Sequence, residues 1–452
     1  MHAARLQLDY QEHPGGIFQC IRHLPWAQLL DSCNADNPHA RYDIMVADPV
    51  YTLIHQEQAS RVYNRQQQLL QNHHDAFSLL ETYLQKFEGL ESDLPFCGGA
   101  MGYWGYDLLD ISKLNDQRID ILNLPDMAIG IYEWAIVTDH KNRNTFLTGL
   151  DLNQLQSIKM LCDCQPNQAK ARQALKVTNY KVDKDLNHYR EDFSRIQKYL
   201  REGDCYQVNY ARCFTANCEG DSWQSYVQLR ELNPVPFAAY LQLPFADIIS
   251  SSPERFIDIT NKVITTSPIK GTRPRFKDKQ SDEQSLNALK FSQKDRAENL
   301  MIVDLLRNDL GKSCVPGSIE VPALFDIERF PTVFHMVSTI KGQLKPEISP
   351  IQAFKNCFPG GSITGAPKKR AMQIIQELET YQRGIYCGSI GYISFNGHLD
   401  TNIAIRTMTV KDNQLCFWAG GGIVSDSIAE QEFQETNDKA RAFFRLLGIS
   451  EP

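Results

Sequence analysis

Several patterns that assign a chain to a common class are missing from this sequence. Its 452 residues contain no apolar run near the roughly 18 residues that a membrane span needs. There is no GxGxxG or Walker phosphate-binding motif, no repeat at a fixed period and no low-complexity segment. The polar stretch at 1–16 has no apolar signal core. We therefore expect a cytoplasmic globular protein.

Excess positive charge and CxxC cysteine pairs are also missing. Lys and Arg total 47 against 54 Asp and Glu, a net charge of −7, which argues against a generally cationic nucleic-acid binder. A local basic pocket for an anionic small molecule stays open. The 12 cysteines are scattered without a CxxC pair, so we expect reduced, packed thiols instead of a zinc site or a disulfide framework.

The chain is long enough for one large domain or two ordinary ones. Its most linker-like stretch, from Gln165 to Asp185, is polar and lacks sustained apolar periodicity. We therefore predict an N-terminal region at 1–165, a linker at 166–185 and a second region at 186–452.

Hydrophobic periodicity predicts separate blocks of helices and strands in the second region. Apolar residues recur at helical spacing from Tyr189 to Leu200, before Gly203 as a natural stop, and residues 205–214 alternate like a strand. Further helices are predicted at Asn287–Asn308, Ile351–Phe358, Ala371–Leu378 and Ile428–Leu447, and further strands at 240–250, 256–267, 388–395, 401–410 and 414–424. Because the strands come mostly in hairpin-like pairs, we predict an α+β fold with antiparallel sheets.

Three glycine-rich stretches need special backbone geometry. The glycines of 94–107 alternate with bulky residues, which favours a structural turn with close backbone packing. The stretch 358–368 is typical of a loop followed by a helix, with Pro367 in the first turn of that helix. The backbone amides at the start of the helix could bind an anion. Gly420–Gly422 follow a predicted strand, and they form either a hairpin turn or a close approach to a ligand.

Acidic side chains are paired at helical spacing in two predicted helices. Asp295 and Glu298 are three residues apart, as are Glu432 and Glu435, and Lys439 follows one turn later. Oxygen ligands from two helices, together with water and substrate oxygens, suit Mg²⁺. Such pairs are also common on solvated helix faces, so the spacing alone does not establish a metal site.

Four further polar side chains stand out from apolar surroundings. Lys270 is placed where a predicted strand enters a turn, a setting that a surface lysine does not need. Arg406 lies within a predicted strand, where a half-buried guanidinium needs a carboxylate partner from the protein or from a ligand. Glu254 and His335 are similar cases, and each of them alone is more often structural.

Seven motifs occur in a fixed order along the chain. They are SPERF (252–256), PIKGT (268–272), DRAENLMIVDLLRND (295–309), FPGGSITGAPK (358–368), GSIGY (388–392), IRT (405–407) and AGGGIVSDS (419–427). Together they resemble the chorismate-utilising enzymes, a family that includes anthranilate, aminodeoxychorismate, isochorismate and salicylate synthases. The resemblance covers 186–447 and implies that family's fold, antiparallel sheets packed as a sandwich with helices outside. The stretches LLDS, LPFCGGAMGYWGYD and LPDMAIGIYEW resemble the N-terminal segment of the amino-transferring members.

Two positions narrow the resemblance to one branch of the family. A lysine at Lys270 is typical of the aminodeoxychorismate synthases, component I, whereas anthranilate synthases typically carry alanine there. Gln207 stands where the water-adding members carry a lysine base, which implies ammonia as the nucleophile. The lack of an appended glutaminase or lyase sequence implies that ammonia comes from a separate glutamine amidotransferase subunit. Anthranilate synthase component I stays the alternative.

The resemblance also implies roles for the polar residues that surround the substrate. Lys270 would add covalently to chorismate, Glu254 would protonate the departing hydroxyl, and His335 would be a proton or hydrogen-bond partner. The other implied substrate contacts are Arg406, Tyr386, Thr272, Ser362, Gln207, Gly420, Gly421, Gly422 and Lys439.

The same resemblance assigns the paired acids to a metal. Glu298 and Glu435 match the ligands of Mg²⁺, which would bind the ring carboxylate of chorismate. Asp295 and Glu432 would act beside them or through water. Chorismate, ammonia and Mg²⁺ are therefore the expected small-molecule partners.

A tryptophan site is a further implication of the resemblance. Anthranilate synthases form their tryptophan feedback site from segments that match Ser32 here, in LLDS, and Pro236 and Phe237, in NPVPF. Asp31 stands where those enzymes have glutamate, so we do not expect feedback. A bound tryptophan with a structural role stays open.

Overall fold

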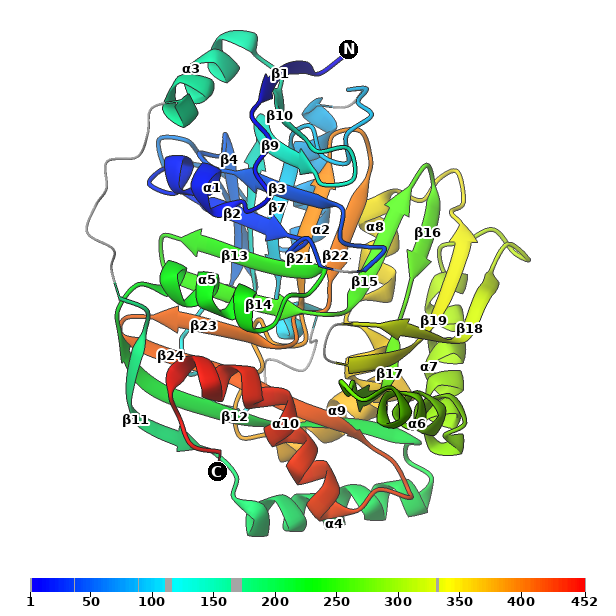
Figure 1. Ribbon diagram of the computed structural model, residues 1–452. Coiled ribbons are helices and arrows are strands. Elements are labelled where there is room, and N and C mark those ends of the chain that lie inside the picture. Colours follow the sequence, from blue (N-terminus) through cyan, green and yellow to red (C-terminus); the bar gives the residue numbers. More distant parts are fainter. Residues whose placement is uncertain are drawn as a thin grey trace.

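The fold is built from two large antiparallel sheets with helices on their outer faces (Figure 1). The computed structural model describes residues 2–35, 37–87, 89–109, 116–163, 173–330 and 333–451. None of the helices in these ranges combines the length and the apolar character needed to cross a membrane. Buried cysteines such as Cys213 and Cys387 carry free thiols, as the sequence predicts.

The first sheet contains 12 of the described strands. Its strands, in spatial order, are β1 (Ala4–Leu8), β10 (Asn144–Gly149), β9 (Trp134–Asp139), β3 (Tyr42–Val46), β2 (Ala27–Asp31), β13 (Phe237–Leu243), β14 (Ala246–Ser252), β23 (Thr407–Lys411), β24 (Gln414–Ile423), β12 (Gln207–Glu219) and β11 (Lys176–Val182). The short β20 (Gly365–Ala366) also pairs with β12.

The second sheet also contains 12 of the described strands. Its strands, in spatial order, are β17 (Ile269–Pro274), β19 (Val333–Gln343), β16 (Val263–Thr266), β15 (Arg255–Thr260), β22 (Leu399–Asn402), β21 (Ser389–Ser394), β7 (Gly99–Trp104), β8 (Met127–Tyr132), β4 (Tyr51–Gln56), β5 (Ala59–Asn64) and β6 (Leu69–His73). The remaining strand, β18 (Glu320–Arg329), pairs with β19.

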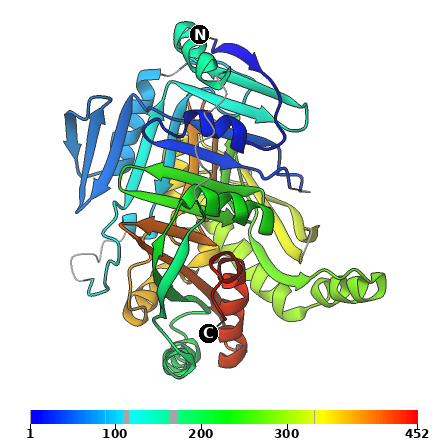
Figure 2. The ribbon, with the colours of Figure 1, turned by 60° about the vertical axis from the view of Figure 1, so that its left-hand side comes forward.

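The helices surround these sheets, and α10 (red) lies at the lower end of the molecule in Figures 1 and 2. The helices are α1 (Gly15–Ile21), α2 (Ala76–Leu84), α3 (Leu152–Asp163), α4 (Leu186–Glu202), α5 (Ser222–Leu232), α6 (Lys279–Lys290), α7 (Gln293–Gly311), α8 (Pro350–Cys357), α9 (Lys368–Leu378) and α10 (Ala429–Leu447). Short 3₁₀ turns are η1 (Gln85–Phe87), η2 (Tyr106–Leu109) and η4 (Gly361–Ile363).

Three apolar clusters hold the two sheets and the outer helices together. One cluster lies between the sheets and contains Ile248 of the first sheet and Tyr103 of the second. A second cluster joins the first sheet to α1, α5 and α10, and it includes Phe443 of α10. A third joins the second sheet to α2, α7 and α8, and it includes Leu306 of α7. The predicted sandwich of antiparallel sheets with outer helices is therefore confirmed.

Both sheets contain strands from both predicted regions. In the first sheet β2 pairs with β13, and in the second β7 pairs with β21, so each sheet is continuous across the two parts of the chain. Residues 164–172, which include the start of the predicted linker at 166–185, lie outside the described residues. The rest of that linker contains β11. The division of the chain into regions stays a prediction.

Local capping explains where several predicted helices begin and end. The Asp185 carboxylate accepts hydrogen bonds from the backbone amides of Asn187 and His188 at the start of α4, and Gly203 ends that helix in the left-handed conformation. The stop at Gly203 agrees with the prediction. The helix predicted over Asn287–Asn308 is instead divided into α6 and α7. Ser292 divides it because its hydroxyl accepts a hydrogen bond from Asp295 N and caps a new helix.

Two glycine-rich stretches lie in strands, which corrects the turn predicted at 94–107 and excludes the hairpin turn that was one of the two interpretations at Gly420–Gly422. Residues Gly99–Trp104 form β7 inside the second sheet, where a Cβ at Gly102 would lie 2.1 Å from the Ala128 carbonyl oxygen. The close backbone packing is confirmed, but the turn is wrong. Gly420–Gly422 lie within β24, paired with β12, and do not form a hairpin turn. In both places glycine has no side chain, so the backbone of the neighbouring strand can approach closely. This close approach does not interrupt the strand.

Candidate active site

Lys270 lies at an irregular point of β17, near the lower end of the second sheet. Its strand pairs with β19 at Ile269 and again at Thr272, and the register shifts between these two positions. Gly271, which follows Lys270, has a φ of +78° that suits glycine. The irregularity leaves the half-buried lysine free to point away from the ladder, and its Nζ donates a hydrogen bond to the Ser362 carbonyl oxygen at 3.2 Å.

The surroundings of Lys270 favour a neutral amine more than water does. Burial lowers the pKa of Lys270, although the carboxylates of Glu298 and Glu254 oppose the shift. The nearby ammonium group of Lys439 lowers this pKa further. Desolvation is the largest of these effects, so a greater fraction of Lys270 is unprotonated than of an exposed lysine.

Glu254 lies in the short link between β14 and β15, beside Lys270. The residue is buried, and burial raises the pKa of its carboxyl group, while a side-chain hydrogen bond from Ser362 and the charge of Lys270 partly offset that rise. Its backbone carbonyl accepts a hydrogen bond from Ile403 N at 3.0 Å, which fixes the link to the neighbouring strand. Because its pKa is raised, this carboxyl group is protonated more often than an exposed glutamate, which suits a proton donor.

A buried ion pair fixes the turn that carries Ser362. Arg383 is fully buried, and its guanidinium makes two hydrogen bonds to the Glu379 carboxylate, at 2.7 and 2.9 Å. The same guanidinium donates to the carbonyl oxygens of Ile363 at 3.0 Å and Asn209 at 2.6 Å. This ion pair therefore joins η4, with Ser362, to β12.

Gln207, the first residue of β12, presents an unpartnered amide inside the protein. Its side chain is fully buried, and neither its oxygen nor its nitrogen has a hydrogen-bond partner among the described residues. The amide lies against β24, where a Cβ at Gly422 would be 2.6 Å from Gln207 Nε2. Buried polar groups are rarely left unpaired, which makes this amide a candidate contact for a small polar ligand.

His335 and Arg406 form the opposite part of the site. His335, on β19, is buried, and Thr272 Oγ1 lies 2.8 Å from its Nδ1. Burial, and then the positive charge of Arg406, lowers the pKa of His335 to about 3, so the ring is neutral at pH 7. The edge of the Phe330 ring packs against the imidazole, with ring centroids 4.9 Å apart.

Arg406 differs from its prediction in backbone position. It lies between β22 and β23 with a φ of +49°, and not within a continuous strand with Asn402. No side chain of the described residues forms an ion pair or hydrogen bond with its guanidinium. Burial alone lowers the pKa of Arg406. A half-buried arginine without an internal carboxylate is available to an anionic ligand, which favours one of the two interpretations left open by the sequence.

Four glutamate and aspartate side chains meet where α7 approaches α10. Glu298 and Asp295 lie on α7, and Glu432 and Glu435 lie on α10. Gly421 of β24 lies beside the two acids of α10, since an added Cβ would lie 3.3 Å from Glu432 Oε2 and 3.5 Å from Glu435 Oε1. The glycine therefore leaves room beside these carboxylates.

The acids differ in their electrostatic environment. Burial raises the pKa values of Glu298 and Glu432, whereas the Lys439 ammonium group, 2.7 Å from Glu435, lowers the pKa of Glu435. Asp295 forms an ion pair with Arg273 at 2.9 Å. In the described part of the chain, no group of three or more His, Cys, Asp or Glu side chains is arranged to hold a metal by itself.

The remaining predicted contacts are placed around the same site. Lys439 Nζ donates to the Gly420 carbonyl oxygen at 2.8 Å, which ties α10 to β24. Tyr386 is buried, and its ring stacks on Trp418 with centroids 6.0 Å apart and planes 11° from parallel. Thr272 is exposed apart from its contact with His335. These residues come from distant motifs that the two sheets bring together.

A model of the family described as chorismate binding enzyme matches residues 30–445. The chain belongs to this family. It is 45% identical over 444 residues to aminodeoxychorismate synthase component 1 of Salmonella typhimurium, with 97% of this chain and 96% of that protein covered. It is 44% identical to the protein of the same name from Escherichia coli, with 95% of each covered.

A solved structure from the chorismate binding enzyme family has the same fold. Anthranilate synthase component I from Streptococcus pneumoniae superimposes with a TM-score of 0.79 and is 31% identical, with 89% of this chain and 91% of that chain covered. The predicted family and fold are therefore confirmed. The roles of the individual site residues stay predictions.

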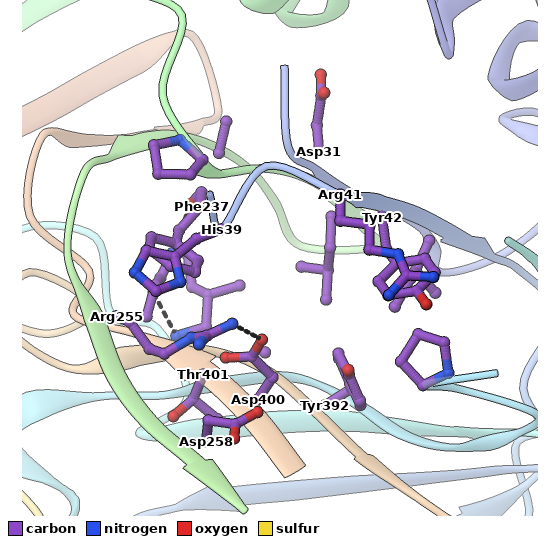
Figure 3. Close-up of a pocket in the computed structure, with 18 of the residues that line it drawn as sticks. Asp31, His39, Arg41, Tyr42, Phe237, Arg255, Asp258, Tyr392, Asp400 and Thr401 are labelled. Atoms are coloured by element: carbon purple, nitrogen blue, oxygen red, sulfur yellow. Dashed lines mark hydrogen bonds and ion pairs between the residues drawn. The ribbon is translucent and has the colours of Figure 1, made fainter. Parts of the chain in front are cut away.

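Two of the three residues predicted to form a tryptophan site line a cavity that is separate from the candidate active site. A cavity of about 290 Å³ is lined by Pro236 and Phe237, together with Asp31 (Figure 3). Ser32 does not line this cavity, because its side chain points into the protein and donates a hydrogen bond to Asp43 Oδ1 at 2.8 Å. Tryptophan binding stays a prediction.

Sequence reasoning missed several residues that shape this part of the protein. Arg255 and Asp400 form an ion pair at 2.8 Å in the cavity wall (Figure 3). His398 Nε2 lies 3.2 Å from Asp258 Oδ2. Arg383 was missed in the same way at the candidate active site. Only its i,i+4 spacing from a glutamate could have indicated a pair, and such spacing is common in any chain.

Removing Arg383 should destabilise the protein strongly. Arg383→Met leaves the buried Glu379 carboxylate unpaired, so we expect the free energy of unfolding to fall by about 3–5 kcal/mol. Urea unfolding measures this change. The control Lys159→Met, which removes an exposed i,i+4 ion pair with Asp163, should change it by less than about 1 kcal/mol. Equal effects of the two substitutions would contradict the structural role of Arg383.

The pKa of His335 predicts a pH dependence of stability. The unfolded histidine binds a proton below about pH 6.5, whereas the folded one does so only near pH 3. Stability is therefore complete above pH 6.5 and falls toward pH 3, by up to about 1.4 kcal/mol per pH unit. Unfolding of His335→Gln should lack this part of the slope, whereas a variant of the exposed His23, His23→Gln, should retain it. An identical slope in His335→Gln would refute the assignment.

Proposed function

We propose that this chain is component I of an aminodeoxychorismate synthase, which converts chorismate and ammonia to 4-amino-4-deoxychorismate for para-aminobenzoate and folate synthesis. The observation that carries the proposal is the half-buried Lys270 beside Glu254. The identity of 45% to a protein with that name supports it. Anthranilate synthase component I is the alternative, and the solved structure with that name is 31% identical.

The proposed chemistry uses Lys270 as a nucleophile. Its neutral amine adds at C2 of chorismate, the ring double bonds shift, and the C4 hydroxyl leaves as water after taking a proton from Glu254. Ammonia then adds at C4, the double bonds shift back, and the lysine amine leaves C2. Nitrogen therefore replaces oxygen at the same carbon. Dividing one difficult substitution into two steps is the general advantage of covalent catalysis.

The pKa shifts of Lys270 and Glu254 support this sequence of steps. An unperturbed lysine with a pKa of about 10.4 is neutral in roughly four molecules in ten thousand at pH 7. Burial lowers the pKa of Lys270 and raises that of Glu254, so both groups shift toward the form that the first step uses. His335, which is neutral, would then orient the substrate by a hydrogen bond.

Cationic and polar groups would hold the substrate and the ammonia. Chorismate carries two carboxylates, and the unpaired Arg406 guanidinium suits one of them. The Gln207 amide, with neither polar atom paired, is suited to orient ammonia, which donates and accepts hydrogen bonds. The further proposed substrate contacts are Tyr386, Thr272, Ser362, Lys439 and the backbone of Gly420, Gly421 and Gly422.

The acidic residues fit Mg²⁺ bound jointly with the substrate. Mg²⁺ is usually held by one or two carboxylates together with water and substrate oxygens, which agrees with a site where protein side chains alone do not complete a metal cluster. Glu298 and Glu435 would hold the ion, with Asp295 and Glu432 beside them. When bound, Mg²⁺ would neutralise the ring carboxylate and the charge that shifts across the ring.

A separate glutamine amidotransferase subunit would supply the ammonia. The name component 1 of the two relatives supports a second subunit for this chain. In the test below, ammonium salt replaces that subunit.

The reaction product decides between the two candidate activities. The purified chain is incubated with chorismate, Mg²⁺ and an ammonium salt, and then with a lyase that removes pyruvate from aminodeoxychorismate. We expect para-aminobenzoate, which is detected by its fluorescence after chromatography. Anthranilate as the main product, without any need for the lyase, would support the alternative instead.

Removing the Lys270 amine should abolish the covalent route. Lys270→Ala should lower the formation of aminodeoxychorismate at least about a hundredfold while retaining chorismate binding. Acid quenching of the unaltered enzyme during turnover, followed by peptide mass spectrometry, should find a chorismate-derived adduct on Lys270. The control Lys277→Ala, at an exposed lysine in the next loop, should turn over normally. Undiminished turnover in Lys270→Ala would rule out this route.

A further inference from the structure

Lys294 links the two acidic helices of the site. It lies in the first turn of α7, and its Nζ is 3.8 Å from Glu298 Oε1 on the same helix. The same Nζ is 3.6 Å from Glu432 Oε1 on α10. One ammonium group therefore lies close to carboxylates of both helices that carry the proposed metal ligands.

This arrangement differs from an ordinary surface ion pair. Lys198 and Glu202 on α4 have the same i,i+4 spacing and the same separation of 3.8 Å, but Lys198 has no carboxylate partner on a second helix among the described residues. Glu298 and Glu432, in contrast, are largely buried, with side chains 18% and 5% exposed. Buried carboxylates that face each other repel, and a nearby cation offsets this repulsion.

The other charges near α10 are already balanced. Glu435 is paired with Lys439 at 2.7 Å, and Asp295 is paired with Arg273 at 2.9 Å. The charge of Lys270 also acts on Glu298, but among the described residues Lys294 is the one whose ammonium group lies within 4 Å of both Glu298 and Glu432. Its side chain is 49% exposed, and so it has room to swing into water on its flexible stem.

We propose that Lys294 is a tethered counter-ion that holds Glu298 and Glu432 together and leaves them when a divalent cation binds. This inference rests on the proposed Mg²⁺ site. The ammonium group and the metal compete for the Glu298 carboxylate, so Lys294 weakens metal binding to the substrate-free enzyme. Chorismate, as a dianion, adds negative charge to the site and shifts the competition toward the metal. Lys294 thereby couples metal binding to substrate binding.

The coupling has a physical benefit for the enzyme. Without Lys294, the two buried carboxylates would attract a divalent cation strongly whether or not chorismate is present. With Lys294, the site stays electrostatically balanced and the helices stay together until the substrate arrives. Lys294 is in this sense a positioning residue, because it acts through the glutamates and not on the reacting atoms.

Metal affinity tests the competition without measuring activity. Binding of Mn²⁺, used as the probe, is followed by its electron paramagnetic resonance signal in the absence of chorismate. We expect Lys294→Gln to bind Mn²⁺ on the order of tenfold more tightly than the unaltered chain, because two ion pairs no longer oppose the metal. The matched variant Lys198→Gln should bind it unchanged. Equal or weaker binding by Lys294→Gln would overturn the inference.

Chemical labelling distinguishes displacement of Lys294 by the metal from electrostatic repulsion between Lys294 and the metal at a distance. The unaltered chain is acetylated briefly with an amine-reactive ester, with and without saturating Mg²⁺, and the labelled peptides are quantified by mass spectrometry. Acetylation of Lys294 should increase severalfold with Mg²⁺, while that of Lys198 should not change. Unchanged labelling of Lys294 in a chain that does bind Mn²⁺ would overturn the inference alone. A chain that binds no Mn²⁺, even with chorismate, would overturn the proposed metal site as well.

Discussion

The geometry of the candidate active site depends on the buried ion pair between Glu379 and Arg383. Four hydrogen bonds from one guanidinium hold the carboxylate and two backbone carbonyls that belong to different segments of the chain. The Glu379 carboxylate in turn accepts from Ala211 N on β12 at 3.0 Å. The same guanidinium holds η4, the turn that contains Ser362, through its hydrogen bond to the neighbouring Ile363. Lys270 and Glu254, which contact Ser362, are positioned in the same way.

Around that fixed frame, reactivity arises from placing lysines among glutamates. Lys270 lies near Glu254 and Glu298, and burial shifts the pKa values of all three groups toward their neutral forms. Lys439, by contrast, is in direct contact with Glu435 and keeps that carboxylate charged. Similar pairs of side chains therefore have opposite protonation tendencies within one site. The difference follows from distance and burial, and not from residue type.

Local signals in the sequence were sufficient for much of the fold. Apolar spacing and the stop at Gly203 predicted α4, because these features act within one element. The break at Ser292 was missed because a capping serine inside a periodic pattern is also compatible with a continuing helix. The left-handed Arg406 was missed because its conformation is imposed by strands that are distant in sequence. The fold class could be predicted, but these details depend on tertiary contacts.

Less of the site could be predicted from composition and spacing alone. The family motifs pointed to Lys270, Glu298 and Glu435, and the structure places these residues within electrostatic reach of one another. Lys294 and Arg383 had no such signal. Their importance appears only when α10 lies beside α7, or when β12 lies beside the turn at 361–363. Contacts between elements that are distant in sequence are invisible to periodicity.

The continuity of both sheets across the chain has a consequence for how the protein folds. Beside the pairing of β7 with β21, the Cys97 backbone amide donates a hydrogen bond to the Ser394 hydroxyl, 297 positions away in the chain. Such contacts raise the contact order and slow folding, because a long loop must close before they form. Until β21 has been synthesised, β7 presents an open edge that can aggregate. We therefore expect a chain truncated before β13 to aggregate more readily than the 452-residue chain, in which β21 covers this edge of β7.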